Sequence, residues 1–205
     1  NSNTFEIKEF YSIKLDPKIS NLNLDNSLNL FEREFIRSIN LRLRSDVKVG
    51  TCLSGGLDSS SVSSLASKSY NKKFSAIHAK SSETESDESK YAKKVSEKLG
   101  LELNILEPSF EDFRLNLNKI VESQEEPFGS PSIIMQFFVF KKARELKCIV
   151  MLDGQGGDET LLGYERYYPV LINSLTSLKK IKALLESSKN SKLSIFQTLK
   201  YQYYF

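Results

Sequence analysis

The sequence predicts an α/β fold in which a parallel, twisted sheet carries helices on both faces. Four short runs rich in β-branched residues alternate with segments whose apolar residues recur at helical spacing, which is typical of βαβ units. Two of these runs lead directly into glycine turns, at residues 54–60 and 153–159. Because the carboxyl ends of parallel strands lie on one edge of a sheet, we expect both turns at that edge.

The first 24 residues differ from the rest because they are polar and rich in asparagine. Residues 5–14 alternate between apolar and polar side chains, which predicts a strand followed by a linker. From Asp25, a candidate N-cap, apolar residues return at helical spacing. This spacing predicts an amphipathic helix that runs to about Arg44.

The remaining elements follow from the same two patterns. Gly100 stands at a C-cap position and ends one helix, and Pro108 ends the strand after it. A polar stretch without apolar periodicity predicts a loop at residues 81–86. The predicted strands are 47–53, 74–79, 101–106 and 148–152, and the predicted helices lie around 62–66, at 87–99, 110–122 and 131–146, and beyond residue 168.

Composition excludes several classes of protein. Hydrophobic residues make up 40% and charged residues 27% of the chain, enough to build a globular core. Basic and acidic residues are interleaved around a net charge of +3, so no basic stripe points to nucleic acid. The longest apolar run, 133–140, is far shorter than the roughly 20 residues of a spanning helix, and no leader opens the sequence. Cys52 and Cys148 lie in apolar runs, which favours free thiols in a reducing compartment. We therefore expect a cytoplasmic protein without a nucleic-acid or membrane partner.

The first glycine turn, Ser54–Ser60, has the composition of an anion site. Gly55 and Gly56 allow a positive φ and remove Cβ atoms, so that backbone amides and the following helix start can face a phosphate. Asp58 would repel that phosphate unless a divalent cation lay between them, so it implies Mg²⁺. The alternative is a tight connection in which Asp58 and the serines only cap the helix.

The second glycine turn, Asp153–Glu159, also follows a predicted strand and carries acidic residues. In a parallel sheet the two turns face each other, which would let Asp58 and Asp158 share one metal ion. One acidic glycine turn is weak evidence, whereas a facing pair favours a functional site.

The two turns resemble the motifs of a known family. The run from Ser54 to Ser59 is similar to the signature of the ATP pyrophosphatases, which GMP, NAD and argininosuccinate synthetases share. The run from Asp153 to Glu159, with Gly163 and Tyr164 after it, resembles the more selective second motif of the asparagine synthetase branch. Residues 74–77 and 87–92 are similar to the same branch, so the resemblance covers about residues 25–168.

This resemblance implies a reaction. ATP would bind with Mg²⁺, the side-chain carboxylate of aspartate would attack the α-phosphorus, and pyrophosphate would leave. Ammonia would then attack the β-aspartyl adenylate and give asparagine and AMP. Positioning and charge stabilisation carry most of the catalysis in such transfers, which suits a pyrophosphate cradle.

The resemblance also implies roles for individual residues. Glu159 and Tyr164 would face the acyl-adenylate as catalytic residues, and Asp58 and Asp158 would hold the metal ion. The residues expected to bind ATP or pyrophosphate are Leu53, Ser54, Gly55, Gly56, Asp58, Ser59, Ala76, Asp153 and Gly154.

The family pattern further implies a domain organisation. Residues 1–24 would be a linker from a missing amino-terminal glutaminase domain, 25–168 the ATP-pyrophosphatase core, and 169–205 the start of a truncated helical part. Members that hydrolyse glutamine begin with a catalytic cysteine, whereas this chain begins with Asn1. We therefore expect a glutaminase domain in the full-length protein, and homodimerisation stays open.

Two departures from the family pattern leave alternatives open. Gln155 stands where many asparagine synthetases carry a glutamate, so the acceptor could be another carboxylate, as in β-lactam-forming or peptide-cyclising relatives. A non-catalytic nucleotide-binding module is a third reading. The family's pyrophosphate-clamping lysine has no match, and Lys179, Lys180 and Lys182 favour a solvated helix face.

Two further features favour structural roles. We expect His78, at the end of the second predicted strand, to be a buried or rim histidine with satisfied nitrogen atoms rather than a ligand. Four residues of the helix at 131–146 favour core packing over a ligand pocket: Met135, Phe137, Phe138 and Phe140.

Overall fold

A computed structural model of the protein describes residues 5–70, 73–81, 83, 87–161, 163–191 and 193–204. The chain divides into two compact units, residues 1–44 and 45–205, and each is described by itself. The boundary at residue 44 lies later than the predicted start of the core at residue 25. The predicted domain organisation stays a prediction.

Among the described residues of the first unit, the only regular elements are helices. The strand predicted within residues 5–14 is wrong, because residues 5–16 have no regular secondary structure and an alternating stretch forms a strand only beside a partner. Helix α1 spans Pro17–Ser20 and α2 spans Leu24–Arg42. The N-cap of α2 is Asn23, whose side chain accepts a hydrogen bond of 2.9 Å from the Asn26 amide. Asp25 lies in the first turn instead, where a carboxylate also favours the helix.

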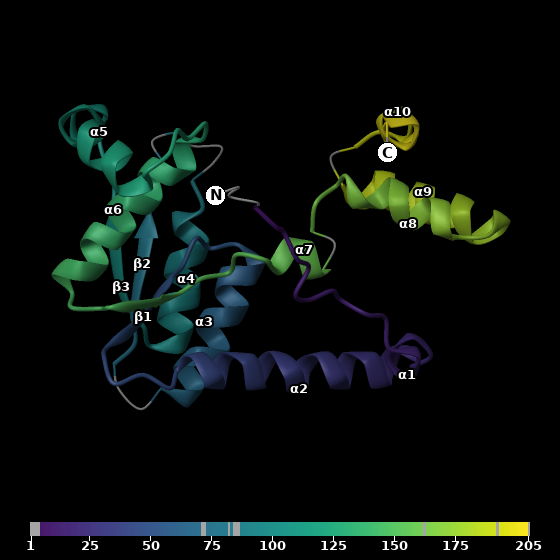
Figure 1. The fold of residues 1–205 in the computed structure, drawn as a ribbon, viewed down its shortest axis with the longest axis horizontal. Helices are drawn as coiled ribbons and strands as arrows, with labels where there is room; N and C mark the ends of the chain where they lie inside the picture. The colour runs from purple at the N-terminus through teal and green to yellow at the C-terminus, as the bar shows by residue number, and fades with distance from the viewer. Residues whose placement is uncertain are drawn as a thin grey trace. The chain divides into compact units, whose positions relative to one another are not determined.

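The second unit contains the four predicted strands, each confirmed to within two residues at its ends. Residues 82 and 84–86 of the predicted loop lie outside the described residues. The elements of this unit are β1 Val49–Cys52, α3 Leu57–Ser69, β2 Ser75–Ala79, α4 Ser89–Leu99, β3 Glu102–Leu106, α5 Phe110–Gln124, α6 Pro131–Glu145, β4 Val150–Leu152, α7 Gly157–Leu161, α8 Tyr167–Ser174, α9 Ser177–Asn190 and α10 Ile195–Tyr204 (Figure 1). Gly100 ends α4 in the left-handed conformation, with φ of 65°, as its C-cap position predicts.

The four strands form one parallel sheet in the order β3-β2-β1-β4. Thr51 of β1 pairs with Ala76 on one side and with Leu152 on the other. The chain therefore winds from β1 outward through β2 and β3, and then returns to the opposite side of β1. This reversal lies between β1 and β4, and ligands bind at such switch points in open parallel sheets.

Neighbouring residues of β2 face opposite layers. Ala76 belongs to a buried cluster with Leu53 and with Ala92 of α4, whereas Ile77 is buried in a cluster that includes Val139 of α6. Helices α3 and α4 lie on one side of the sheet and α5 and α6 on the other (Figure 1). The predicted fold class, a parallel sheet with helices on both faces, is confirmed.

The helical region after residue 168 is also confirmed. Helices α8, α9 and α10 contact one another, and Ile172 and Thr198 are buried among them. None of the described helices combines the length and the apolar character that crossing a membrane requires.

Candidate nucleotide-binding site

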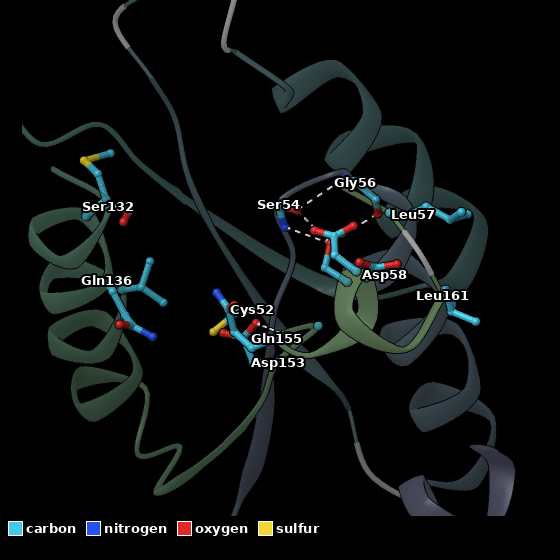
Figure 2. A pocket seen from close by; sticks show the side chains of 16 residues that line it. Cys52, Ser54, Gly56, Leu57, Asp58, Ser132, Gln136, Asp153, Gln155 and Leu161 are labelled. Atoms are coloured by element: carbon cyan, nitrogen blue, oxygen red, sulfur yellow. Dashed lines mark hydrogen bonds between the residues drawn. The ribbon is translucent and has the colours of Figure 1, made fainter. Parts of the chain in front are cut away.

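A cavity of about 570 Å³ opens at the carboxyl ends of β1 and β4, where the sheet reverses its winding. Both glycine turns contribute to its wall, and so does one face of α6 (Figure 2). Seven of the predicted site residues line it: Ser54, Gly56, Asp58, Ser59, Asp153, Gly154 and Asp158. The two turns therefore meet, as the parallel topology predicts.

The first turn depends on glycine at one position above all. Gly55 has φ of 102°, and a Cβ there would lie 2.8 Å from the Glu88 carbonyl oxygen, just before α4. The turn is closed by short hydrogen bonds: Ser54 Oγ and Ser59 Oγ lie 2.8 Å apart, and the Gly56 amide donates to Ser54 Oγ at 3.1 Å. The sequence thus folds into a compact loop whose backbone is pressed against α4.

The start of α3 has no side-chain cap. Gly56 is its N-cap residue and makes no capping hydrogen bond with a side chain, so the structure does not support the alternative in which Asp58 only caps the helix. The Ser60 hydroxyl is buried without a partner among the described residues. Uncapped amides at a helix N-terminus are donors that an anion can use.

The second turn packs directly on the first. A Cβ on Gly154 would lie 2.7 Å from the Ser59 amide nitrogen, and one on Gly157 would lie 2.5 Å from the carboxyl carbon of Asp58. Two segments about a hundred residues apart in sequence can approach this closely only because glycine occupies the contact positions.

Negative charge gathers where the turns meet. Burial raises the pKa of Asp58, and the nearby carboxylates of Asp158 and Glu159 raise it further. A divalent cation would relieve this repulsion, so the donor set fits Mg²⁺. The described residues contain no group of three side chains that could hold a metal ion by itself. Protein carboxylates would therefore supply only part of the coordination, and phosphate and water the rest.

Glu159 and Tyr164 do not line the cavity, but they contact each other. The Tyr164 hydroxyl donates a hydrogen bond of 3.0 Å to Glu159 Oε1, and this bond raises the pKa of the phenol. The guanidinium of Arg166 stacks 4.4 Å from the centre of the Tyr164 ring. Sequence reasoning did not single out Arg166, although a basic residue two positions after the Gly-Tyr pair was visible.

Leu53 and Ala76 are fully buried and do not line the cavity. Leu53 directly follows β1, whereas Ala76 is the second residue of β2, and the two share a buried cluster with Ala92 of α4. Lys179, Lys180 and Lys182 do not line the cavity either. Lys180 donates to Asn173 at 3.2 Å, and Lys182 lies 3.7 Å from Glu186.

One wall of the cavity was missed by the sequence analysis. Ser132, Met135, Gln136 and Val139 of α6 line it, so the expectation that Met135 packs in the core is wrong. Phe138 is buried as expected, whereas Phe140 is 46% exposed. The apolar residues of α6 are spread around the helix, which hides the face that turns toward the cavity.

Cys52, at the end of β1, also lines the cavity. Cys52 and Cys148 are both free thiols, as predicted. Burial raises the pKa of Cys52 to about 12, and the charge of Asp153 adds to the effect. The thiol therefore stays protonated and acts as a weak donor rather than as a nucleophile.

His78 is the satisfied buried histidine that the sequence predicts. It is 2% exposed, and its two ring nitrogens have separate partners. Nδ1 lies 2.8 Å from the Leu53 carbonyl oxygen, and Nε2 lies 2.9 Å from Ser89 Oγ.

Comparison with known proteins defines the class of this chain. The family model described as Asparagine synthase matches residues 30–204, which is most of the chain. The chain therefore belongs to the asparagine synthase family, and the recognition made from the two glycine turns is confirmed.

Individual relatives agree with this assignment. The glutamine-hydrolysing asparagine synthetase 1 of Bacillus subtilis is 37% identical over 132 residues, which are 63% of this chain and 20% of the relative. Asparagine synthetase 2 of the same organism is 29% identical over 156 residues, 70% of this chain and 20% of the relative. The chain thus spans about a fifth of the length of these curated relatives.

Solved structures with a similar arrangement are more distant. An NH3-dependent NAD synthetase from Campylobacter jejuni superimposes with a TM-score of 0.45 at 21% identity, covering 66% of this chain and 60% of that one. A U34-tRNA thiolase from Methanococcus maripaludis superimposes with a TM-score of 0.48 at 22% identity, covering 81% of this chain and 58% of that one.

Proposed function

We propose that this chain provides the synthetase half of an ATP-dependent ligase that forms an amide bond through an acyl-adenylate. The observation that carries the proposal is the meeting of the two glycine turns over one cavity, with Asp58 and Asp158 both in its wall. Membership in the asparagine synthase family supports aspartate as the carboxylate substrate and ammonia as the nucleophile. The products would be asparagine, AMP and pyrophosphate.

The first turn would bind the pyrophosphate end of ATP. Backbone amides at the uncapped start of α3 and the hydroxyls of Ser54 and Ser59 supply donors in a fixed array. Asp58 and Asp158 would hold Mg²⁺, which when bound neutralises the charge that develops on the leaving pyrophosphate. The backbone amides need no reorganisation, because the turn is already closed by its own hydrogen bonds, whereas the hydroxyl hydrogens would turn from their partners within the turn toward the phosphate.

The second turn and the strand ends would bind the adenosine part. Asp153 and Gly154 line the cavity, and the backbone of Leu53, which follows β1, would contribute together with that of Ala76 in β2. Glu159 and Tyr164 would face the acyl end, where their hydrogen bond can position the substrate or pass a proton.

Nucleotide binding tests the first part of this proposal. We expect titration calorimetry to detect ATP binding that requires Mg²⁺, and we expect Asp58→Asn to remove the dependence on Mg²⁺. Gly129→Ala is a matched control, because a Cβ there meets nothing within 4 Å. Absence of nucleotide binding by the wild-type chain with Mg²⁺ would contradict the proposal.

Pyrophosphate release tests the substrate. We expect release to depend on aspartate and to yield asparagine when ammonium is added. A glutaminase domain would supply ammonia in the full-length protein, and this chain by itself would use free ammonium instead.

A second candidate function keeps adenylation but changes the carboxylate. Gln155 lines the cavity at the position where many asparagine synthetases carry a glutamate, which favours a β-lactam-forming or peptide-cyclising type of acceptor. Pyrophosphate release that responds to aspartate would exclude it. ATP binding without release in the presence of any of these carboxylates would instead indicate a non-catalytic nucleotide-binding module.

A further inference from the structure

His78 connects the strand that precedes the first glycine turn to the helix that packs against that turn. Its Nδ1 lies 2.8 Å from the carbonyl oxygen of Leu53, the residue before Ser54. Its Nε2 lies 2.9 Å from the hydroxyl of Ser89, the first residue of α4. The side chain is almost completely buried, and these two contacts satisfy both of its ring nitrogens.

The contact with Leu53 fixes the position of one ring hydrogen. A carbonyl oxygen only accepts, so Nδ1 carries the hydrogen and donates it. The Leu53 amide in turn donates to the Ile77 carbonyl oxygen at 2.9 Å. Both polar groups of Leu53 are therefore bound to β2, and the residue cannot rotate about its backbone without breaking one of them.

The hydrogen bond from His78 to Leu53 also fixes the orientation of the peptide group between Leu53 and Ser54. The Leu53 carbonyl and the Ser54 amide belong to the same planar trans peptide, so they point in opposite directions. With the carbonyl held by His78, the Ser54 N–H turns into the first glycine turn, where it lies 3.2 Å from Ser59 Oγ. His78 thus determines the direction of the first amide of the turn.

The contact with Ser89 sets the distance to α4. Gly55 packs on the Glu88 carbonyl and the Ala92 amide, where a Cβ would lie 2.8 Å and 3.1 Å away. Ser89 is itself bound to Asp87, whose carboxylate accepts from the Ser89 amide at 3.0 Å and from its hydroxyl. With its one hydrogen given to Asp87, the Ser89 hydroxyl accepts from Nε2, so Nε2 donates as well. The imidazole ring therefore acts as a spacer between the end of β1 and the helix surface on which the turn rests.

We propose that His78 is a positioning residue that orients the Ser54 amide and holds the first glycine turn in its anion-binding form. The inference rests on the proposed function, because it assigns a role within the same nucleotide site. His78 does not itself touch the nucleotide, since it lies beneath the turn and does not line the cavity.

Two amide substitutions each keep one of the two contacts of His78 and remove the other. In His78→Asn the amide can replace the Nδ1 donor to Leu53, whereas in His78→Gln the longer amide reaches the position of Nε2 and Ser89. We expect His78→Asn to bind Mg²⁺-ATP within about threefold of the wild type, and His78→Gln to bind it about tenfold more weakly, as one lost hydrogen bond implies. Ser96→Ala is the matched control, because Ser96 is a buried serine of α4 whose hydroxyl donates to the Lys93 carbonyl, away from the turn.

A purely structural role predicts a different result. It would lower the urea midpoint of His78→Gln while leaving its nucleotide affinity equal to that of the wild type, and that outcome would overturn the inference. Amide hydrogen exchange of Ser54 gives a readout that needs no nucleotide. We expect exchange to accelerate at least about tenfold in His78→Gln and to stay unchanged in His78→Asn and Ser96→Ala.

The two proposals fail in distinguishable ways. A wild-type chain that binds no nucleotide contradicts the proposed function, while the exchange of the Ser54 amide still tests the role of His78. The nitrogen chemical shifts of the wild-type imidazole add a test that does not depend on whether a variant folds. They must report a hydrogen on Nδ1, and an unprotonated Nδ1 would overturn the inference.

Discussion

Replacing Gly154 by alanine would force the two glycine turns apart. The new Cβ would lie 2.7 Å from the Ser59 amide nitrogen and 3.0 Å from the Asp58 carbonyl carbon, whereas ordinary Cβ contacts begin at 3.4 Å. The backbone must therefore move by about 0.7 Å (3.4 − 2.7) at the first contact. Both atoms belong to the first turn of α3, so no flexible side chain can swing away and relieve the clash.

Overpacking of this kind lowers the free energy of unfolding by about 1–3 kcal/mol. With a urea m-value of about 2 kcal/mol/M for a chain of this size, the unfolding midpoint should fall by about 0.5–1.5 M. Because the displaced atoms form the proposed anion site, Mg²⁺-ATP binding should weaken as well. Circular dichroism during urea unfolding measures the first effect and titration calorimetry the second.

Gly129→Ala provides the control for this experiment. Its Cβ meets no atom within 4 Å, and Gly129 does not have a positive φ. Alanine there should leave the midpoint unchanged or raise it slightly, by restricting the unfolded chain. If Gly154→Ala unfolded at the same urea concentration as Gly129→Ala, the close contact between the turns would be refuted.

Three further outcomes follow from the site. Burial and neighbouring carboxylates raise the pKa of Asp58. Ionising Asp58 therefore costs more in the folded chain than in the unfolded chain, so the free energy of unfolding falls as pH rises from about 4 through the raised pKa. Asp58→Asn should therefore raise the urea midpoint at pH 7, with a gain that shrinks toward pH 4, and a gain independent of pH would contradict this origin. With a pKa of about 12, Cys52 should react with a thiol reagent at pH 8 about a thousandfold more slowly than a free cysteine, and rapid labelling of the folded chain at Cys52 would disprove its shielding. Tyr164→Phe removes an exposed hydrogen bond, so it should leave the urea midpoint unchanged. It should lower the rate of pyrophosphate release about a hundredfold, and an unchanged rate would exclude a role in the chemistry.

The features that could be predicted from the sequence are those with local causes. β-branched runs and helical spacing identified the four strands, and Gly100 marked the end of α4. The meeting of the two glycine turns was also predictable, because a parallel sheet places the carboxyl ends of its strands on one edge. Asp58 and Asp158 were assigned to one site on that ground, and the family resemblance implied the same pairing.

The features that could not be predicted depend on packing between distant elements. The alternation at residues 5–14 resembles a strand, but a strand requires a neighbour, and local pattern carries no information about one. The α6 wall was missed for a related reason. Met135 and Phe138 are both apolar, and only the docking of α6 on the sheet decides which of them reaches the cavity.

β1 lies between β2 and β4 in the sheet, and this position determines when the cavity can form during folding. Its hydrogen bonding to β4 joins residues such as Thr51 and Leu152, 101 positions apart, and pairings of such long range form slowly because a large loop must close first. The cavity cannot exist before that closure, so the proposed nucleotide would bind only chains that have completed it and would stabilise them by mass action. Nucleotide binding measured during refolding would therefore report when β4 pairs with β1.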